Sequence, residues 1–505
     1  MPRAIGTVIS SLDGPSTQHF EFVVREDSGK IPTHKGQFVQ VKTEQGMLIG
    51  RITEIIKTNR YFMEAESVRE YEKSGKPLTE VFPIERWEYL IAKTTPLGVY
   101  EDGRVQRVSY PPSPGTLVEK VDKNTLSDFL GLDHEKGLNI GKVAFHGVDA
   151  SLNLTKLFQK HLAILATTGF GKSYLVSVLI EELLDRPEEL GKPAIVVVDP
   201  HGEYIGFKRD EKYKDVTKVF DKNSLSIAVS SLSPYRIMEF LPQMSPVQLR
   251  ELMKIMEKLA SKHKQYGLDE LINTIENSDI KRVTKDTIIS WLLNLKSSGL
   301  FSTVDRPSIG ELAKSGQLTI LDISDFIRLT EKQMIVTHIA RKLFHARRTE
   351  KIPPFLLILE EAHQFCPEGA RKERAISKGI IESIAREGRK FHASLVLVSQ
   401  RPIQLSTTAL SQCNTNIFLR IVNPYDIKHI AESCEGITSD IMDMLPGLRV
   451  GEAIITGNAI NYPSIIHVRR RRSKEHAKFR MSLEDAILSF NRKVKMSEKD
   501  IDAFM

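Results

Sequence analysis

The chain has little cysteine. Its 505 residues include only 3 cysteines, and none of them forms a C-x-x-C pair. This argues against a disulfide framework and against a zinc site. No apolar run approaches the roughly 18 residues of a membrane span, and the N-terminus lacks the apolar stretch of a secretory signal. We therefore expect a soluble, cytoplasmic protein with reduced thiols and no membrane partner.

An excess of negative charge is also absent. The formal net charge is +7 and the isoelectric point is near 9.0, which favours a polyanionic partner. The charge alone decides little, because a charged fraction of 27% also suits an ordinary solvated surface. The length predicts two or three domains.

Residues 1–122 predict a small β-barrel. Short runs rich in β-branched and aromatic residues alternate there with glycine- and proline-containing turns. Barrels of this kind mostly act as scaffolds or docking modules, so we expect no catalytic role. The expected strands are Ile5–Ser10, His19–Val24, Gln37–Thr43, Met47–Ile56 and Glu88–Ala92.

The pattern then changes to strands that alternate with helices, which indicates an α/β core with a mostly parallel sheet. We place this core at residues 123–470. Within it, residues 208–315 are helix-rich and charged, so we interpret them as a helical insertion. Residues 471–505 predict a C-terminal helix and a polar tail.

A glycine-punctuated turn joins an apolar run, residues 161–165, to an apolar helical stretch, residues 174–184. Glycines let backbone N–H groups surround an anion, and the helix N-terminus adds its positive end. We expect Lys172 to reach the β- and γ-phosphates of ATP and Ser173 to ligate Mg²⁺. The expected nucleotide-binding residues are Ala166, Thr167, Thr168, Gly169, Phe170, Gly171, Lys172, Ser173 and Tyr174.

Ala166 departs from the usual phosphate-loop pattern, which has glycine at this position. Alanine fits there if its φ is negative. The alternative is a strand–helix turn with a chance Lys-Ser pair. Strand, loop and helix in the right order disfavour that alternative.

Two adjacent acids, Glu360 and Glu361, follow the fully apolar run 355–359. Such a run is typical of a central strand buried on both faces, where acids are costly without a cation. We expect Glu360 to join the Mg²⁺ shell and Glu361 to polarise the attacking water. A solvated pair of acids at a strand end is the alternative.

Two further strands are expected to end in functional side chains. Asp199 follows the apolar run 194–198, which places it at the ligand edge of a parallel sheet. Gln400 follows the apolar run 391–399, where a polar side chain can sense the γ-phosphate.

Arg386 and Arg389 share one face of the helix that precedes the last of these strands. The arginine fork suits charge that spreads over transferring phosphate oxygens, so either residue could act as an arginine finger in a neighbouring subunit. A basic, solvated helix end is an equally good interpretation of the residues alone.

Together these motifs resemble the HerA family, archaeal hexameric DNA translocases of the FtsK-like branch of RecA-fold ATPases. The motifs are the phosphate loop, Asp199–Tyr204, Leu359–His363, Arg386 and Val398–Pro402. The resemblance covers nearly the whole chain, because the family also carries an N-terminal barrel.

The resemblance implies a RecA-like P-loop ATPase that forms a homohexameric ring around double-stranded DNA, with ATP and Mg²⁺ at the subunit interfaces. It implies that Glu361 is the catalytic acid, Arg386 the finger and Asp199 a further active-site acid. It also implies action in DNA end resection during double-strand break repair. The implied partner is the nuclease NurA, docked on the barrel side.

Basic residues follow the acid-bearing strand, where RecA-like motors commonly place pore loops. Phosphate contacts from such residues give salt-sensitive binding that is independent of sequence. The run Arg469–Arg472 is the second candidate for DNA contact, although it also suits a solvated or neighbour-binding segment. The first-choice DNA-binding residues are Arg371, Lys372, Arg374 and Lys378.

Two other functions stay open. One is a related ATPase that pumps conjugative DNA or protein at a membrane. The other is an ATP-gated scaffold ring that recruits a nuclease without motor work. The paired acids and the arginine candidates favour ATP turnover, and the barrel and the missing membrane segment disfavour the conjugative pump.

Overall fold

The computed structural model describes residues 4–10, 14–26, 33–59, 88–101, 103–369, 375–475, 483–485 and 487–490, with isolated positions at 62, 66, 68, 69 and 73. The chain forms two compact units. The first comprises Met1–Leu154 and Gly436–Arg469, and the second comprises Thr155–Glu435 and Arg470–Met505. The expected boundaries at residues 122 and 470 stay predictions. Among the described residues, no helix has the length and apolar character needed to cross a membrane.

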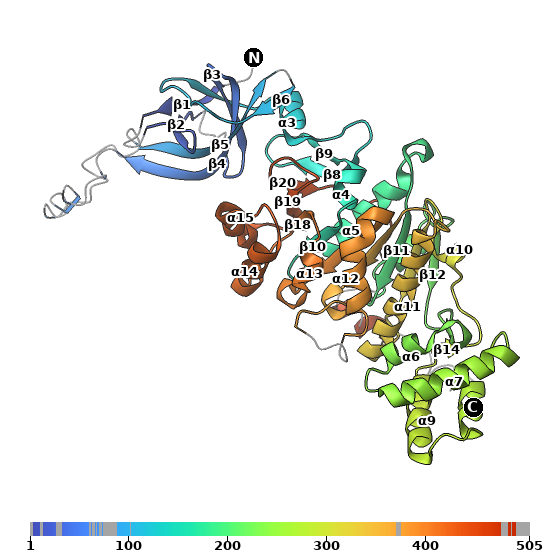
Figure 1. The fold of residues 1–505 in the computed structure, drawn as a ribbon. Coiled ribbons are helices and arrows are strands. Elements are labelled where there is room, and N and C mark those ends of the chain that lie inside the picture. The colour runs from blue at the N-terminus through green and yellow to red at the C-terminus, as the bar shows by residue number, and fades with distance from the viewer. Residues whose placement is uncertain are drawn as a thin grey trace. The chain divides into compact units, whose positions relative to one another are not determined.

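The first unit begins with a closed barrel, which confirms that prediction (Figure 1). Its strands follow the order β2-β1-β7-β3-β4-β5, and β2 pairs with β5 to close the ring. The short strand β6 (Arg104–Gln106) extends β5 as a hairpin. The barrel strands are β1 (Ala4–Ile9), β2 (Phe20–Val24), β3 (Phe38–Thr43), β4 (Gly46–Asn59), β5 (Glu88–Glu101) and β7 (Leu117–Lys120).

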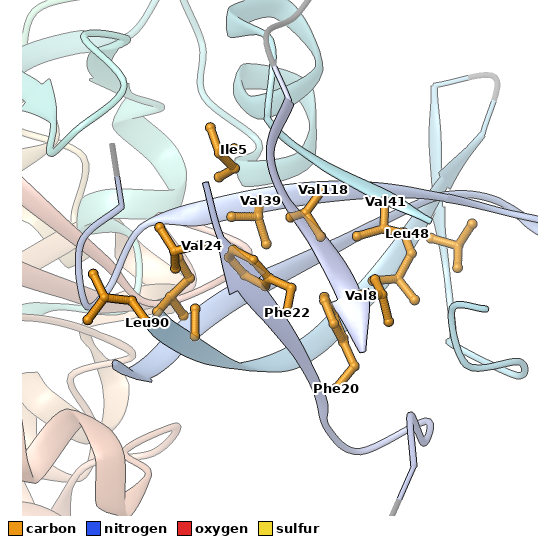
Figure 2. Packing of buried hydrophobic residues seen from close by; sticks show 13 residues of the cluster. Ile5, Val8, Phe20, Phe22, Val24, Val39, Val41, Leu48, Leu90 and Val118 are labelled. Carbon is orange, nitrogen blue, oxygen red and sulfur yellow. The ribbon is translucent and has the colours of Figure 1, made fainter. Parts of the chain in front are cut away.

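Alternating side chains fill the barrel (Figure 2). In β2, Phe20, Phe22 and Val24 are buried while the residues between them are partly exposed, as expected for a strand with one face in a core. Gly6 lets the strand β1 pass close to this core, because a Cβ there would lie 2.3 Å from the Phe22 ring. The barrel therefore has its own hydrophobic core.

The rest of the first unit is a small antiparallel sheet in the order β19-β20-β8-β9. The helix α3 (Lys123–Leu130) precedes it, with an Asp122 N-cap and a left-handed Gly131 C-cap. The side chain of Arg51, in β4, pairs with Asp440 in α15 (Ser439–Met444). The strands of the small sheet are β8 (Leu138–Val143), β9 (Asp149–Leu152), β19 (Glu452–Gly457) and β20 (Ser464–Val468).

The second unit contains a parallel sheet in the order β12-β15-β11-β16-β17-β10-β18, which confirms the predicted α/β core. From β15 to β18 in this order every strand residue is buried, so both faces are covered. The helices α5 (Lys172–Asp185), α11 (Leu329–Arg348) and α12 (Lys378–Glu387) lie beside it (Figure 1). The strands are β10 (Leu162–Leu165), β11 (Ala194–Asp199), β12 (Thr217–Phe220), β15 (Leu318–Asp322), β16 (Phe355–Leu359), β17 (Ala393–Ser399) and β18 (Thr415–Phe418).

The helical insertion follows β12 instead of starting near residue 208. The strand β12 pairs with β15 and forms the edge of the main sheet. The sequence did not predict this strand, because it has only four residues and lies in a charged segment. The insertion has a small core that includes Leu252, Leu271 and Leu292. Its helices are α6 (Pro234–Phe240), α7 (Pro246–Lys262), α8 (Leu268–Glu276) and α9 (Arg282–Ser297).

The barrel core gives a prediction about stability. We expect Leu48→Ala to lower the free energy of opening of the barrel by about 2–5 kcal/mol, because it leaves a cavity in a packed core. Leu48 is 0% exposed. Hydrogen exchange of the β3, β4 and β5 amides measures this free energy.

The matched control is Leu117→Ala, because Leu117 lies in the barrel strand β7 but is 55% exposed. We expect a change within about 0.5 kcal/mol for the control. Equal losses for the two variants would contradict the assignment of Leu48 to the core.

Candidate nucleotide-binding and catalytic site

The phosphate loop ends in two glycines with left-handed backbone conformations. Gly169 has φ 82° and Gly171 has φ 90°, values that glycine adopts without a steric cost. Gly171 is the N-cap of α5, and no side chain of a described residue caps this helix end. The N–H groups in the first turn of α5 are therefore open to an anion.

Ala166 fits the loop without strain. It is fully buried and is not among the residues with positive φ. Its N–H donates to the carbonyl of Ser399 at 3.2 Å, so it continues the pairing between β10 and β17. The expectation that alanine is tolerated here is confirmed.

A cavity of about 780 Å³ opens in front of this loop. That volume lies within the usual range for small-molecule sites. Lys172 is only 8% exposed, so its ammonium group is held at the cavity wall rather than extended into solvent. The lining residues are Thr168, Gly169, Gly171, Lys172, Ser173, Tyr174, His201, Glu203, Glu361, Gln400, Arg471 and Glu475.

The strand order explains how distant residues reach one cavity. The strand β17 lies between β10 and β16, so the phosphate loop, Gln400 and Glu361 follow three neighbouring parallel strands. Parallel strands place their carboxyl ends at one edge of a sheet. The Thr168 hydroxyl donates to Oε1 of Gln400, which ties the loop to the tip of β17.

Glu360, the expected Mg²⁺ ligand, is buried and is not among the residues that line the cavity. The hydroxyl of Tyr204, itself fully buried, donates to Oε1 of Glu360. Burial raises the pKa of Glu360 to about 8, because the charged form loses its hydration. A cation beside this carboxylate would favour its charged form, as the Mg²⁺ hypothesis requires.

Glu361 lies in the cavity in an unusual backbone conformation. Its φ is 50°, which is uncommon for a residue with a side chain and frequent at functional sites. Burial raises the pKa of this carboxyl. Its Oε2 atom is buried and has no hydrogen-bond partner among the described residues, although Nδ1 of His363 lies 3.3 Å away. An orphaned carboxylate oxygen fits a water or metal ligand that completes the site.

His363 supplies no positive charge to Glu361. Burial, together with the nearby Arg401 and Lys172, lowers the pKa of His363 to about 4, so the ring is neutral near pH 7. Nδ1 of His363 also lies 3.1 Å from the hydroxyl of Ser399, at the end of β17. The neutral ring therefore lies between Glu361 and the end of β17.

Asp199 has a different environment from the one expected for a catalytic acid. It is fully buried, does not line the cavity, and accepts the backbone N–H groups of residues 201–204 at 2.8–3.2 Å. Burial raises its pKa to about 6. This geometry makes Asp199 the organiser of the turn that carries His201 and Glu203 to the cavity. A direct catalytic role for Asp199 stays a prediction.

Four lining residues were missed from the sequence. His201 and Glu203 had a visible signal, because they directly follow the strand that ends in Asp199. Arg471 and Glu475 had none, since only the fold brings the C-terminal segment next to α5.

The structure also bears on the basic run Arg469–Arg472, the second candidate for DNA contact. Arg472 pairs with Glu182 and Asp185 on α5, so its side chain is a poor candidate for DNA contact.

Arg386 is a surface residue in its own chain. It lies in α12, its side chain is 52% exposed, and Nη1 is 3.9 Å from Glu382. It is not among the lining residues. Lys378 begins the same helix, 3.8 Å from Glu382. The other predicted DNA-binding residues, Arg371, Lys372 and Arg374, lie outside the described residues.

Comparison with known sequences identifies the family of this chain. Residues 138–343 match the family model "Helicase HerA, central domain". The DNA double-strand break repair helicase HerA of Saccharolobus solfataricus is 31% identical over 71% of this chain and 73% of that protein. This chain belongs to the HerA family.

Other HerA relatives extend the similarity along the chain. A probable helicase of Methanocaldococcus jannaschii is 30% identical over 92% of this chain and 95% of that protein. The DNA double-strand break repair helicase HerA of Pyrococcus furiosus is 27% identical over 86% of this chain and 87% of that protein. The alignments therefore span most of the chain.

Two solved structures share the fold of this chain. VirB4 of Thermoanaerobacter pseudethanolicus superposes with a TM-score of 0.54 at 14% identity, over 68% of this chain and 98% of that chain. The plasmid coupling protein TrwB in complex with ADP and Mg²⁺ gives 0.50 at 14% identity, over 70% of this chain and 94% of that chain. The HerA chain thus has a P-loop ATPase fold.

The two adjacent acids give a prediction. We expect Glu361→Gln to bind ATP normally but to lower turnover by about 10²-fold or more, because it removes a general base. We expect Glu360→Gln to weaken Mg²⁺-dependent nucleotide binding, because it removes a charged metal ligand. Calorimetric titration with and without Mg²⁺, together with a steady-state ATPase assay, measures both effects. Equal affinity and equal residual turnover in the two variants would contradict this division of roles.

Proposed function

We propose that this protein is an ATP-driven translocase of double-stranded DNA that works as a homohexameric ring. We propose further that it acts with the nuclease NurA in DNA end resection during double-strand break repair. The observation that carries the proposal is one cavity, in a chain of the HerA family, that joins an open phosphate loop to Glu361 and Gln400. A DNA substrate also suits the expected cytoplasmic location.

In this proposal the cavity binds ATP by its phosphates. Lys172 and the first turn of α5 would hold the β- and γ-phosphates, and Ser173, which lines the cavity, would hold Mg²⁺ through its hydroxyl oxygen. Glu360 does not line the cavity, so its place in the Mg²⁺ shell requires the ion or a coordinated water to reach its buried carboxylate. When bound there, Mg²⁺ would neutralise charge on the phosphate oxygens. Glu361 positions and deprotonates the attacking water. Gln400, tied to Thr168, reports the presence of the γ-phosphate.

The exposure of Arg386 supports a ring with shared active sites. An arginine on the surface and outside its own cavity is available to a neighbouring subunit. Its present partner, Glu382, is 3.9 Å away, and a pair at that distance on a helix is worth only about 0.5 kcal/mol. The helix α12 can therefore release Arg386 to a neighbour's γ-phosphate at little cost.

The alternatives are less well supported. VirB4 and TrwB share the fold, but a likeness at 14% identity does not support a shared function. A scaffold ring that binds ATP without turnover would not need Glu361 held in a left-handed conformation with an unpaired buried oxygen.

We also propose the barrel as the docking side for NurA, since none of its described residues lines the cavity.

The experiment that tests the function is a steady-state ATPase assay with and without linear duplex DNA. We expect DNA to stimulate turnover of the unaltered protein and Lys172→Ala to abolish both nucleotide binding and turnover. Lys262→Ala is the matched control, because this exposed lysine lies at the end of α7 in the insertion. Retained DNA-stimulated hydrolysis in a folded Lys172→Ala protein would overturn the site, and turnover indifferent to DNA would overturn the motor.

A mixing experiment tests whether Arg386 acts in trans. Arg386→Ala should lower turnover by about 10³-fold, because it removes a finger, while ATP binding persists. Glu361→Gln subunits are also inactive alone. Mixed rings contain interfaces with an intact Glu361 and an intact Arg386, so ATPase activity should partly return. No recovery in rings that exchange subunits would place Arg386 in its own site or in none, and Arg389 is the next residue to test.

The proposed DNA track gives a prediction about salt. Replacing Arg371, Lys372 and Arg374 with alanine should weaken duplex DNA binding and reduce the log–log salt slope by about 0.9 for each lost phosphate contact. The control replaces three exposed lysines of the insertion, Lys258, Lys262 and Lys264. Fluorescence anisotropy with labelled duplex DNA at several salt concentrations measures both slopes. Equal slopes would place the DNA track elsewhere.

A further inference from the structure

The nucleotide cavity has a wall that lies outside the phosphate loop and the acid pair. It is formed by Tyr174 in the first turn of α5 and by residues 470–475, which we call the C-terminal strap. Arg471 and Glu475 of this strap line the same cavity as Lys172. Neither residue belongs to the phosphate loop or to the acid pair, so the wall needs a separate explanation.

The strap is firmly attached to α5. Glu181, fully buried, accepts hydrogen bonds from the N–H groups of Arg472 and Ser473 at 2.8 and 2.7 Å, and from the Ser473 hydroxyl at 2.8 Å. The Arg472 guanidinium binds Glu182 at 3.0 Å and Asp185 at 2.9 Å. The strap is therefore a built part of the site rather than a loose tail.

These attachments fix the position of Arg471. Its N–H donates to the Tyr174 hydroxyl at 2.6 Å, and its Nε donates to the Ser473 hydroxyl at 2.8 Å. Its Nη2 donates to the carbonyl of Lys474 at 3.0 Å, and the guanidinium lies over the Phe207 ring at 5.4 Å. Nη1 makes no hydrogen bond within the described part of the chain, which leaves donors for a ligand.

The charges of this wall suit a neutral polar ligand better than another phosphate. Arg471 and Glu475 bring opposite charges to one wall, and Glu475 would repel a phosphate placed there. Hydroxyls and the edges of a base present both donors and acceptors, which match such a pair. We propose that the C-terminal strap binds the ribose and base of the nucleotide and that Arg471 makes the contact. This proposal depends on the proposed nucleotide site.

Two probes separate this proposal from the nucleotide site itself. ADP carries the ribose and base, whereas inorganic pyrophosphate carries only the phosphates. Calorimetric titration of the full chain in the presence of Mg²⁺ measures both affinities. Arg471→Ala should weaken ADP binding about tenfold, the effect of losing one hydrogen bond to a charged group, and leave pyrophosphate binding unchanged.

Three further variants complete the test. Arg472→Ala should weaken ADP binding in the same selective way but less, because it loosens the strap without removing the contact. Lys474→Ala should change neither affinity, because its exposed side chain does not line the cavity. Lys172→Ala should weaken the binding of both ADP and pyrophosphate. If Lys172→Ala left both affinities unchanged, the phosphate site would be overturned, whatever the result for Arg471→Ala.

The outcomes for Arg471→Ala are decisive. Selective loss of ADP affinity supports the proposal. Loss of affinity for both probes would show that Arg471 binds phosphate, and no loss for either probe would show that the strap only packs against α5. Both of these results overturn the proposal.

Discussion

Two adjacent carboxylates at the end of β16 carry a high cost of burial. Glu360 and Glu361 follow a strand with no exposed residue, in a place where water cannot solvate them well. The protein compensates with the Tyr204 hydroxyl and with the nearby Lys172. The surrounding elements are arranged to supply these compensating groups, so much of the site's structure depends on this one electrostatic constraint.

Asp199 shows how far this dependence reaches. Its carboxylate holds four consecutive N–H groups and so shapes the turn that delivers Tyr204 to Glu360. Asp199 thus positions Tyr204, the hydrogen-bond partner of Glu360, although no hydrogen bond joins the two acids themselves. A substitution at Asp199 would disturb the position of Glu360 through Tyr204, and an activity assay would register this as a catalytic defect.

Much of this site could be predicted from sequence because its parts are local. The phosphate loop, the acid pair and Gln400 each follow an apolar strand directly, and parallel strands bring their ends to one edge. The barrel was equally predictable, since alternating apolar residues and turn residues mark each long strand. Short strands were not, as β7 and β12 show with four residues each.

The residues that could not be predicted depend on long-range contacts. Arg471 reaches the cavity only because Glu181 and Asp185, nearly three hundred positions earlier, bind the strap that carries it. No periodicity or spacing encodes such a contact. The turn role of Asp199 was also invisible, because an acid at a strand end suggests a ligand and only the structure shows that backbone N–H groups occupy it.

The helix α5 links the two ends of this arrangement. Its first residue, Lys172, lines the cavity, and its last, Asp185, binds Arg472. At 1.5 Å per residue, a helix of 14 residues is about 21 Å long. Because a hydrogen-bonded helix moves as a rod, a tilt of a few degrees at the phosphates swings the far end by more than an ångström. The C-terminal strap, bound to the far end of α5, would therefore shift when the phosphate loop shifts, through one stiff element.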